Sequence, residues 1–265
     1  MLKKLFSLTA LVVLCCAFSF ADQWNKSFTV TGTPQLTVHA GDGNIHIEPW
    51  DKNEISIEVT TVGWHIGGNG VHIDAHQNWN NIDLDVALKG IHITFSSGIN
   101  KHRIDIEVRM PKEAKLDLNT SDGSIRMADM KGEFHLQTGD GRLVLENLDG
   151  SLDAHSGDGA IEARGRFDRL DLRTNDGSIR ATVLAGSRMA GPWSFRSGDG
   201  SIHLALPRDI SAELQMHTGD GHIHSDLPLT VQGSLDKHTM HGKLNGGGEL
   251  MTLRTGDGSI ELQQL

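Results

Sequence analysis

Apolar residues recur along the middle of the chain as pairs two positions apart, and each pair begins nine residues after the previous one. Eight such pairs lie between residues 116 and 181: Leu116/Leu118, Ile125/Met127, Phe134/Leu136, Leu143/Leu145, Leu152/Ala154, Ile161/Ala163, Leu170/Leu172 and Ile179/Ala181. Because successive side chains of a β-strand point to opposite faces, an apolar pair at i and i+2 marks one face of a short strand. The pattern therefore predicts a succession of short strands separated by tight corners.

The corners between these strands alternate in composition, so the full repeat is 18 residues long. Every second corner carries an Asp-Gly dipeptide, at Asp122, Asp140, Asp158 and Asp176, whereas the corners between them read MKGE, LDGS and GRFD. The pattern resumes after an insertion around LAGSRMAGP and continues to the end of the chain, and an earlier copy surrounds HAGDGNI. One repeat thus holds two short strands and two unlike corners.

Two all-β architectures fit this repeat. In an antiparallel meander the Asp-Gly dipeptide would form a hairpin turn. In a parallel β-solenoid each rung stacks on the previous one, and equivalent residues form columns about 4.8 Å apart. Recurrence of the same residue types every 18 positions favours the solenoid, because stacking aligns them. We predict regular solenoid repeats over residues 116–265, preceded by an irregular N-terminal β cap and first rungs over residues 22–115, the two being continuous as one domain.

The segment RIDIEVRMPKEAKLDLNTSDGSIRM, followed by rungs that turn at G-D-G or S-D-G, resembles the bacterial putative-adhesin family of unknown function. The likeness covers most of the chain after residue 21 and is strongest from 104 to 205. It implies an exported two-sheet β-solenoid with glycine-centred turns and a surface-associated, non-catalytic role. It supplies no catalytic residues.

The Asp-Gly corners would form one column of the solenoid. We predict a structural corner at each of them: Asp122, Gly123, Asp140, Gly141, Asp158, Gly159, Asp176, Gly177, Asp199, Gly200, Asp220, Gly221, Asp257 and Gly258, with Asp42 in the earlier copy. Each carboxylate is expected to accept hydrogen bonds from its own turn, and each glycine to supply a positive φ. A Ser or Thr stands two residues before each Asp except the first, and we expect these to form hydroxyl ladders. Calcium binding by the acidic column is the alternative.

A column of basic and amide side chains is predicted beside the acidic one. The residues three positions before each Asp are never acidic: His39, Asn119, Gln137, His155, Arg173, Arg196, His217 and Arg254. Because like charges one strand apart repel each other, we expect this column to offset the acidic one.

Histidines offer a second candidate for chemistry. If the rungs of Asp199 and Asp220 are adjacent, His203 and His224 stack on each other, with His217 and His222 nearby. These four side chains would then be candidate zinc or copper ligands, or a charge switch near pH 6. Exposed histidines on a polar strand face are the commoner explanation, so we predict no cofactor.

The first 21 residues have the features of a signal peptide. Lys3 and Lys4 precede an apolar run that is short for a membrane span, and Ser-Phe-Ala at 19–21 suits a signal peptidase. We predict export, to the periplasm, the cell surface or the medium, with cleavage before Asp22.

Both cysteines, Cys15 and Cys16, lie in this leader, so the mature chain has none and must be held by its core alone. A lipoprotein anchored through one of them is the alternative, disfavoured by the bulky leucine before Cys15. Without its two leader lysines, a chain of net charge −10 is near −12. This charge argues against nucleic-acid binding, and no second apolar run could span a bilayer.

Three functions are compatible with these features. The favoured one is an exported, non-catalytic β-solenoid that serves as an adhesin-like or cell-envelope binding and scaffold protein. A carbohydrate-active β-helix enzyme would need acidic groups converging in a cleft, usually built by long loops, and only 184–192 and 226–249 interrupt the rungs. A metal-binding (Ca or Zn) exported protein is the third. The expected partners are a cell-surface glycan or envelope protein, or a second copy pairing with the C-terminal strand SIELQQL, whose edge is predicted to be free.

Overall fold

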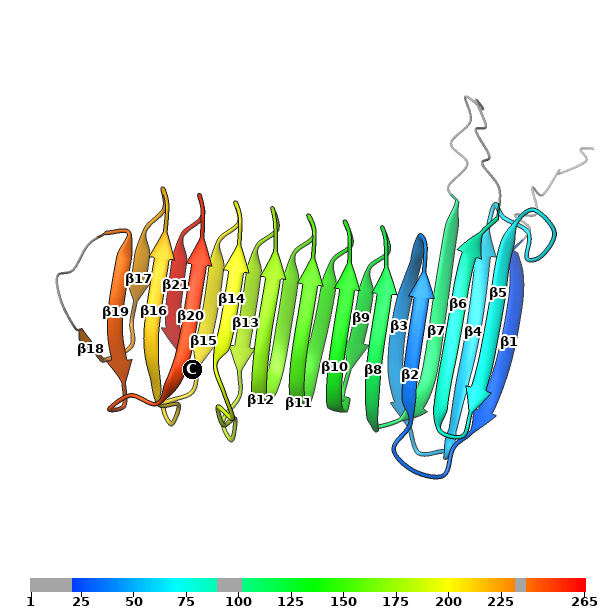
Figure 1. Cartoon of the computed structure of the whole chain (residues 1–265), viewed down its shortest axis with the longest axis horizontal. Helices are drawn as coiled ribbons and strands as arrows, with labels where there is room; N and C mark the ends of the chain where they lie inside the picture. The colour runs from blue at the N-terminus through cyan, green and yellow to red at the C-terminus, as the bar shows by residue number, and fades with distance from the viewer. Residues whose placement is uncertain (1–20, 90–101, 232–236) are drawn as a thin grey trace, which may run out of the picture.

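The computed structural model describes residues 21–89, 102–231 and 237–265. The predicted signal peptide therefore lies, except for Ala21, outside the described residues. All regular structure in the described part is β-strand, which confirms the prediction of an all-β fold (Figure 1). The described residues contain no helix long and apolar enough to cross a membrane.

The sheet has 21 strands. Their bounds are β1 (Ala21–Thr29), β2 (Gln35–Ala40), β3 (Gly43–Trp50), β4 (Glu54–Val62), β5 (Val71–Asn78), β6 (Asn81–Leu88), β7 (Arg103–Pro111), β8 (Glu113–Thr120), β9 (Ile125–Ala128), β10 (Lys131–Thr138), β11 (Leu143–Ser156), β12 (Ile161–Thr174), β13 (Ile179–Val183), β14 (Trp193–Ser197), β15 (Ile202–Leu206), β16 (Ala212–Thr218), β17 (Ile223–Ser225), β18 (Leu229–Val231), β19 (Thr239–Leu244), β20 (Glu249–Thr255) and β21 (Ile260–Gln264).

The strands lie side by side in two facing rows (Figure 1). Row A runs in the order β5–β6–β2–β8–β10–β11–β12–β14–β20–β16–β19–β18. Row B runs in the order β1–β4–β7–β3–β9–β11–β12–β13–β15–β21–β17. The long strands β11 and β12 contribute to both rows, with a shift in register where they cross between them.

Most neighbours within a row are parallel. From β8 to the second half of β12, each residue pairs with the residue 18 positions further on, as in the series Leu116, Phe134, Leu152 and Leu170. Strands β2 and β3, which carry the earlier copy of the motif, stack directly on β8 and β9. Antiparallel pairs occur only towards the two ends of the rows, among the described strands.

The last rung in the sequence is not the last rung in space. Strand β20 lies between β14 and β16, and β21 lies between β15 and β17. The prediction of a free edge at SIELQQL is therefore wrong, because the backbone of residues 260–262 is paired on both sides. Within the described residues, the short strands β17 and β18 form the edges at this end instead.

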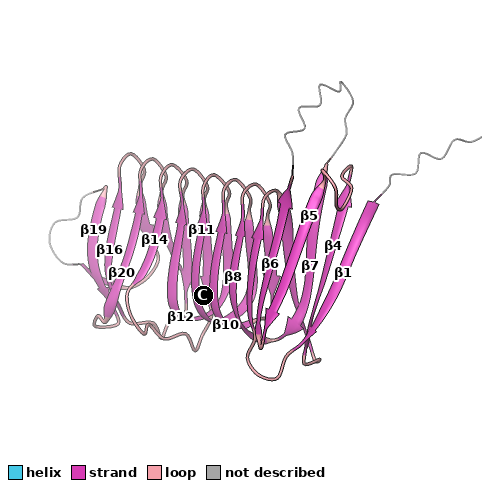
Figure 2. Ribbon diagram, turned by 45° about the vertical axis from the view of Figure 1, so that its right-hand side comes forward, coloured by secondary structure: helices cyan, strands magenta, loops and turns pink. Residues whose placement is uncertain are grey.

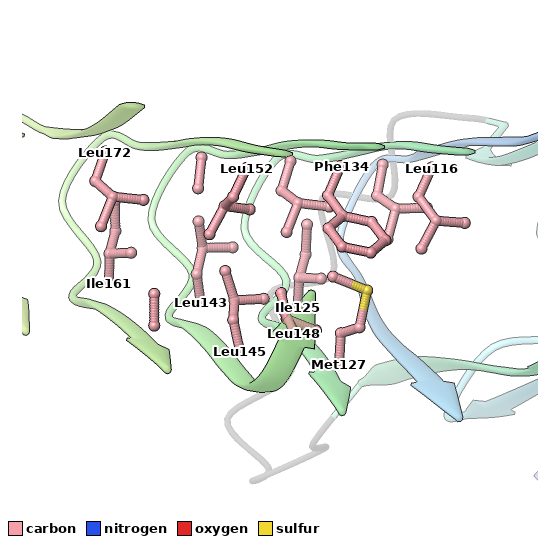
Figure 3. Packing of buried hydrophobic residues seen from close by; sticks show 14 of the residues in the cluster. Leu116, Ile125, Met127, Phe134, Leu143, Leu145, Leu148, Leu152, Ile161 and Leu172 are labelled. Atoms are coloured by element: carbon pink, nitrogen blue, oxygen red, sulfur yellow. The ribbon is translucent and has the colours of Figure 1, made fainter. Parts of the chain in front are cut away.

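The inward side chains of the two rows form one hydrophobic core (Figure 3). Phe134, Leu152 and Leu172 of row A point toward Ile125 and Ile161 of row B. All five side chains are buried, at the inward positions predicted from the apolar pairs. A core that extends along every rung in this way accounts for stability without disulfides.

The N-terminal end of the core is covered by antiparallel strands. Trp24 and Trp64 pack, partly buried, against the core there. The Asp22 carboxylate accepts a hydrogen bond from the Ile66 backbone N–H at 3.0 Å and lies 3.2 Å from Nδ1 of His65. These two contacts favour the ionised form and lower the pKa of Asp22. They attach the start of β1 to the turn after β4.

Candidate functional site

The Asp-Gly corners form a row of arched turns along one long edge of the molecule (Figure 2). Beneath them lie buried hydroxyl side chains: Thr120, Thr138, Ser156, Thr174, Ser197, Thr218 and Thr255. Thr138 shows the arrangement. Its Oγ1 donates to the Gly123 carbonyl of the neighbouring rung at 2.8 Å and accepts from the Gly141 N–H of its own turn at 3.1 Å. The hydroxyls thus bond to the backbone and join successive corners. The prediction of a hydroxyl ladder is wrong, because each hydroxyl bonds to backbone groups and not to the next hydroxyl.

The corner glycines are required because successive rungs approach closely. No glycine that follows a corner Asp has a positive φ; such values occur at the other type of corner, at Gly132 (140°) and Gly150 (130°). A Cβ added at Gly141 or Gly159 would lie closer than 3.0 Å to the carbonyl oxygen of the equivalent glycine one rung earlier. The predicted reason for glycine was therefore wrong, because space and not φ excludes a side chain here.

The carboxylates of the corners face solvent. All eight Asp side chains of this column are exposed, and none accepts a hydrogen bond in the part of the chain that the structure describes. The prediction that they bond within their own turns is wrong, because the N–H groups there have other acceptors. The Asp140 N–H, for example, donates to the Ser121 carbonyl at 3.1 Å, and the Gly141 N–H donates to Thr138.

The candidate histidines are not brought together as predicted. The rung of Asp257 separates the other two rungs, so Glu261 stands between His203 and His224 in the register. His203 Nδ1 lies 2.9 Å from Glu261 Oε2, and His224 Nε2 lies 2.9 Å from Asp226 Oδ1. Each of these imidazoles therefore has a carboxylate partner of its own.

The other two candidate ligands, His217 and His222, lie apart from His203 and His224. His217 belongs to row A, where its Nδ1 lies 3.1 Å from the Thr239 hydroxyl, whereas His222 precedes β17 of row B. No group of three or more His, Cys, Asp or Glu side chains could hold a metal ion among the described residues. The structure thus gives no support to a metal site at His203, His217, His222 and His224, or at the acidic column.

A groove of about 770 Å³ crosses the outer face of row A, and sequence reasoning missed it. We call it the row A groove; it is lined by Gln35, Lys115, Leu116, Asp117, Glu133, Phe134, His135, Ser151, Leu152, Asp153, Asp168, Arg169, Leu170, Asp171, Ala190 and Pro192. Its polar lining includes five carboxylates against two permanent cations, so the groove is acidic. The sequence did contain a signal for this groove. The residue between the two apolar residues of each row A strand is polar, and at 18-residue spacing these residues are Asp117, His135, Asp153 and Asp171.

Polar contacts hold the walls of the row A groove in place. Lys115 Nζ lies 2.9 Å from Glu133 Oε2, and the Ser151 hydroxyl donates to Asp168 at 2.8 Å. His135 Nδ1 lies 3.4 Å from Asp153 Oδ2. Hydrogen-bond donors and acceptors therefore lie side by side along an open surface.

The predicted column of basic and amide side chains lies on the same outer face. All eight members stack, in the order His39, Asn119, Gln137, His155, Arg173, Arg196, Arg254 and His217. The Arg173 guanidinium donates to Asp171 of its own strand, which raises the pKa of Arg173. No ion pair joins this column to the corner carboxylates within the described residues, so any offset of the acidic charge acts without direct contact.

Fold and surfaces together define an all-β protein of stacked strands with polar outer faces, an acidic open groove and a ridge of exposed carboxylates. The chain belongs to the Toastrack DUF4097 family, whose model matches residues 22–263. This agrees with the family resemblance noted in the sequence. A comparison with curated proteins finds no match.

Solved structures of similar chains share little sequence with this one. A putative cell adhesion protein from Clostridium sporogenes is 12% identical, with a TM-score of 0.43, and covers 93% of this chain and 100% of its own. A putative adhesin from Parabacteroides merdae is 13% identical, with a TM-score of 0.45, over 91% of this chain and 95% of its own. A putative lipid binding protein from Parabacteroides distasonis is 16% identical, with a TM-score of 0.46, over 91% and 96%.

Proposed function

We propose that this protein is an exported, non-catalytic parallel β-solenoid with rungs of 18 residues, and that it acts as an adhesin-like or cell-envelope binding and scaffold protein. The observation that carries the binding role is the row A groove, an open polar surface that crosses several rungs. The 18-residue offset between paired residues of β8, β10, β11 and β12 supports the architecture.

Solvent exposure of the groove carboxylates supports binding over catalysis. A glycosidase needs one carboxyl group that stays protonated, which is usually achieved by removing it from water. The Glu133 and Asp153 side chains are 65% and 55% exposed, so water solvates their charges. Asp117 and Asp171 are half-buried, and no carboxylate of the groove is fully buried, so the groove offers hydrogen-bond acceptors without the sequestered acid that hydrolysis requires.

The ligand that fits this surface best is an extended glycan. Sugar hydroxyls both donate and accept hydrogen bonds, and the groove presents carboxylate acceptors beside Lys115 and Arg169 as donors. A groove that crosses successive rungs offers polar side chains to successive sugar residues. Its negative charge, on a chain of net charge −10, opposes a nucleic acid.

A glycan array with the mature protein tests the binding role. Replacement of Asp153 by Asn removes a charged acceptor from the middle of the groove, and we expect affinity for the bound glycan to fall about tenfold. Glu146→Gln, on the outer face of row B, is the matched control and should bind as the unaltered protein does. Absence of any glycan binding, or equal binding by Asp153→Asn, would contradict the proposal.

Export is tested separately by expressing the whole chain in a bacterium. We expect the mature protein to begin at Asp22, because the residues before it have the order of a signal peptide and its cleavage site. Intact-mass spectrometry of the periplasmic and secreted fractions measures this. A product that keeps the leader, or one lipidated at Cys15 or Cys16, would show that the expected processing is wrong.

A further inference from the structure

The turn between β5 and β6 presents a tryptophan to solvent at the N-terminal end of the molecule. Figure 1 shows this connection at the lower edge of that end. Trp79 is 89% exposed; among the described residues only one other large hydrophobic side chain, Leu265 at 53%, is exposed. A ring of this size normally buries most of its surface, so its position needs a cause other than packing.

The backbone of Trp79 is also in an unfavourable conformation. Its φ is 58°, and it is the first central residue of a two-residue hairpin turn between Asn78 and Asn81. Glycine, asparagine or aspartate usually occupies this position, because a bulky side chain is strained at positive φ. The chain thus places an aromatic residue where neither packing nor turn geometry favours one.

Neighbouring side chains hold this turn in place without using the indole ring. Gln77 Nε2 donates to the Trp79 carbonyl and to the Thr29 carbonyl, both at 2.7 Å. Asn80 Oδ1 accepts from the Thr31 N–H at 2.9 Å. The turn is therefore attached to the β1–β2 connection, and the ring is presented by a fixed backbone.

The turn carries uncharged amides on both sides of Trp79 in the sequence. Asn78 and Asn81 face each other across the hairpin, are exposed, and make no side-chain hydrogen bond in the described part of the chain. An aromatic face with amides beside it suits a pyranose, because the ring covers the sugar's C–H face while the amides bond its hydroxyls. The turn itself has no basic side chain to attract an anionic headgroup.

The turn adjoins the row A groove. Gln35 lines the groove, pairs with Asn81 on one side and Lys115 on the other, and donates its N–H to the Asn80 carbonyl at 2.9 Å. We propose that Trp79, Asn78 and Asn81 form a sugar-binding tip at the N-terminal end of the row A groove, where one pyranose of a bound glycan stacks on the indole. This inference rests on the proposed glycan-binding function and assigns the residues that contact the end of the glycan.

The test uses Trp79→Gly, which removes the ring and also relieves the strain of positive φ. We expect this variant to melt at the same temperature as the unaltered protein or higher, and to bind the glycan selected on the array at least tenfold more weakly in calorimetry. Trp79→Phe, which keeps an aromatic face, should retain most of the affinity. A variant with Ala at both Asn78 and Asn81 should lose affinity while keeping its fold.

Each of the remaining outcomes would contradict one or both proposals. If Asp153→Asn weakens glycan binding but Trp79→Gly binds as well as the unaltered protein, the sugar-binding tip is wrongly assigned and the proposed function stands. If Trp79→Gly melts at a distinctly lower temperature, the ring is structural and the tip is again wrong. If no glycan binds, both proposals fail. Binding of the protein to phosphatidylcholine vesicles that is lost in Trp79→Gly would assign the ring to a lipid surface instead.

Discussion

Replacement of Gly159 by alanine will lower the free energy of unfolding by about 3 kcal/mol or more. The new Cβ would lie closer than 3.0 Å to the carbonyl oxygen and carbon of Gly141 and to Oγ of Ser156. The backbone has little room to move away. The Gly159 carbonyl accepts from Thr174 of the next rung, and the Gly159 N–H donates to Ser156, which itself donates to the Gly141 carbonyl of the previous rung. Urea denaturation followed by circular dichroism measures the change.

Gly41→Ala is the matched control for this prediction. Gly41 belongs to the same type of corner, where it precedes the Asp, but a Cβ at this position meets no atom within 4 Å and its φ is not positive. We expect its effect to stay within about 0.5 kcal/mol, as for a surface substitution that meets no neighbouring atom. Equal effects at Gly41 and Gly159 would show that glycine is needed for chain flexibility and that the close approach of the rungs is not the cause.

Thr138→Val should lower the free energy of unfolding by about 2–4 kcal/mol, although valine has nearly the same shape. The lost hydroxyl leaves two buried backbone groups without partners, the Gly123 carbonyl and the Gly141 N–H. An unsatisfied buried polar group costs about 1–3 kcal/mol, because water cannot replace the missing partner. The same denaturation experiment measures it.

Two further substitutions separate the hydroxyl from other effects. Thr138→Ser keeps the hydroxyl and should cost about 1 kcal/mol for the lost methyl group, since Ser156 fills the same position one rung later. Thr37→Val changes an outward threonine that makes no side-chain hydrogen bond in the described structure, and should have little effect. A Thr138→Val protein as stable as the unaltered one would mean that the hydroxyl column does not hold the corners together.

The corners add to the stability that the hydrophobic core provides, whereas the outer faces are free to vary. The buried hydroxyl and the glycine join each rung to the next, whereas the polar side chains of the row A groove lie on the outside of the strands. We therefore expect substitutions at Asp153 or Trp79 to change the proposed glycan binding while the rungs stay intact.

The amino-acid sequence by itself determined the local structure. The nine-residue spacing of apolar pairs such as Phe134/Leu136 predicted which side chains point inward, because strand periodicity is a property of neighbouring residues. The Asp-Gly dipeptides likewise marked the turns, and the polar positions marked the outer faces. The family resemblance followed from the same repeat.

Only the tertiary structure decided how the rungs are ordered and what their side chains meet. Because the rungs resemble one another, their repeat cannot specify which pairs with which, and the chain places Asp257 between Asp199 and Asp220. That order separated His203 from His224. Gly159 must be glycine because the backbone of the neighbouring rung lies too close for a side chain, and this distance cannot be read from the sequence of one rung. The row A groove and its junction with the Trp79 turn likewise depend on contacts between residues far apart in the chain.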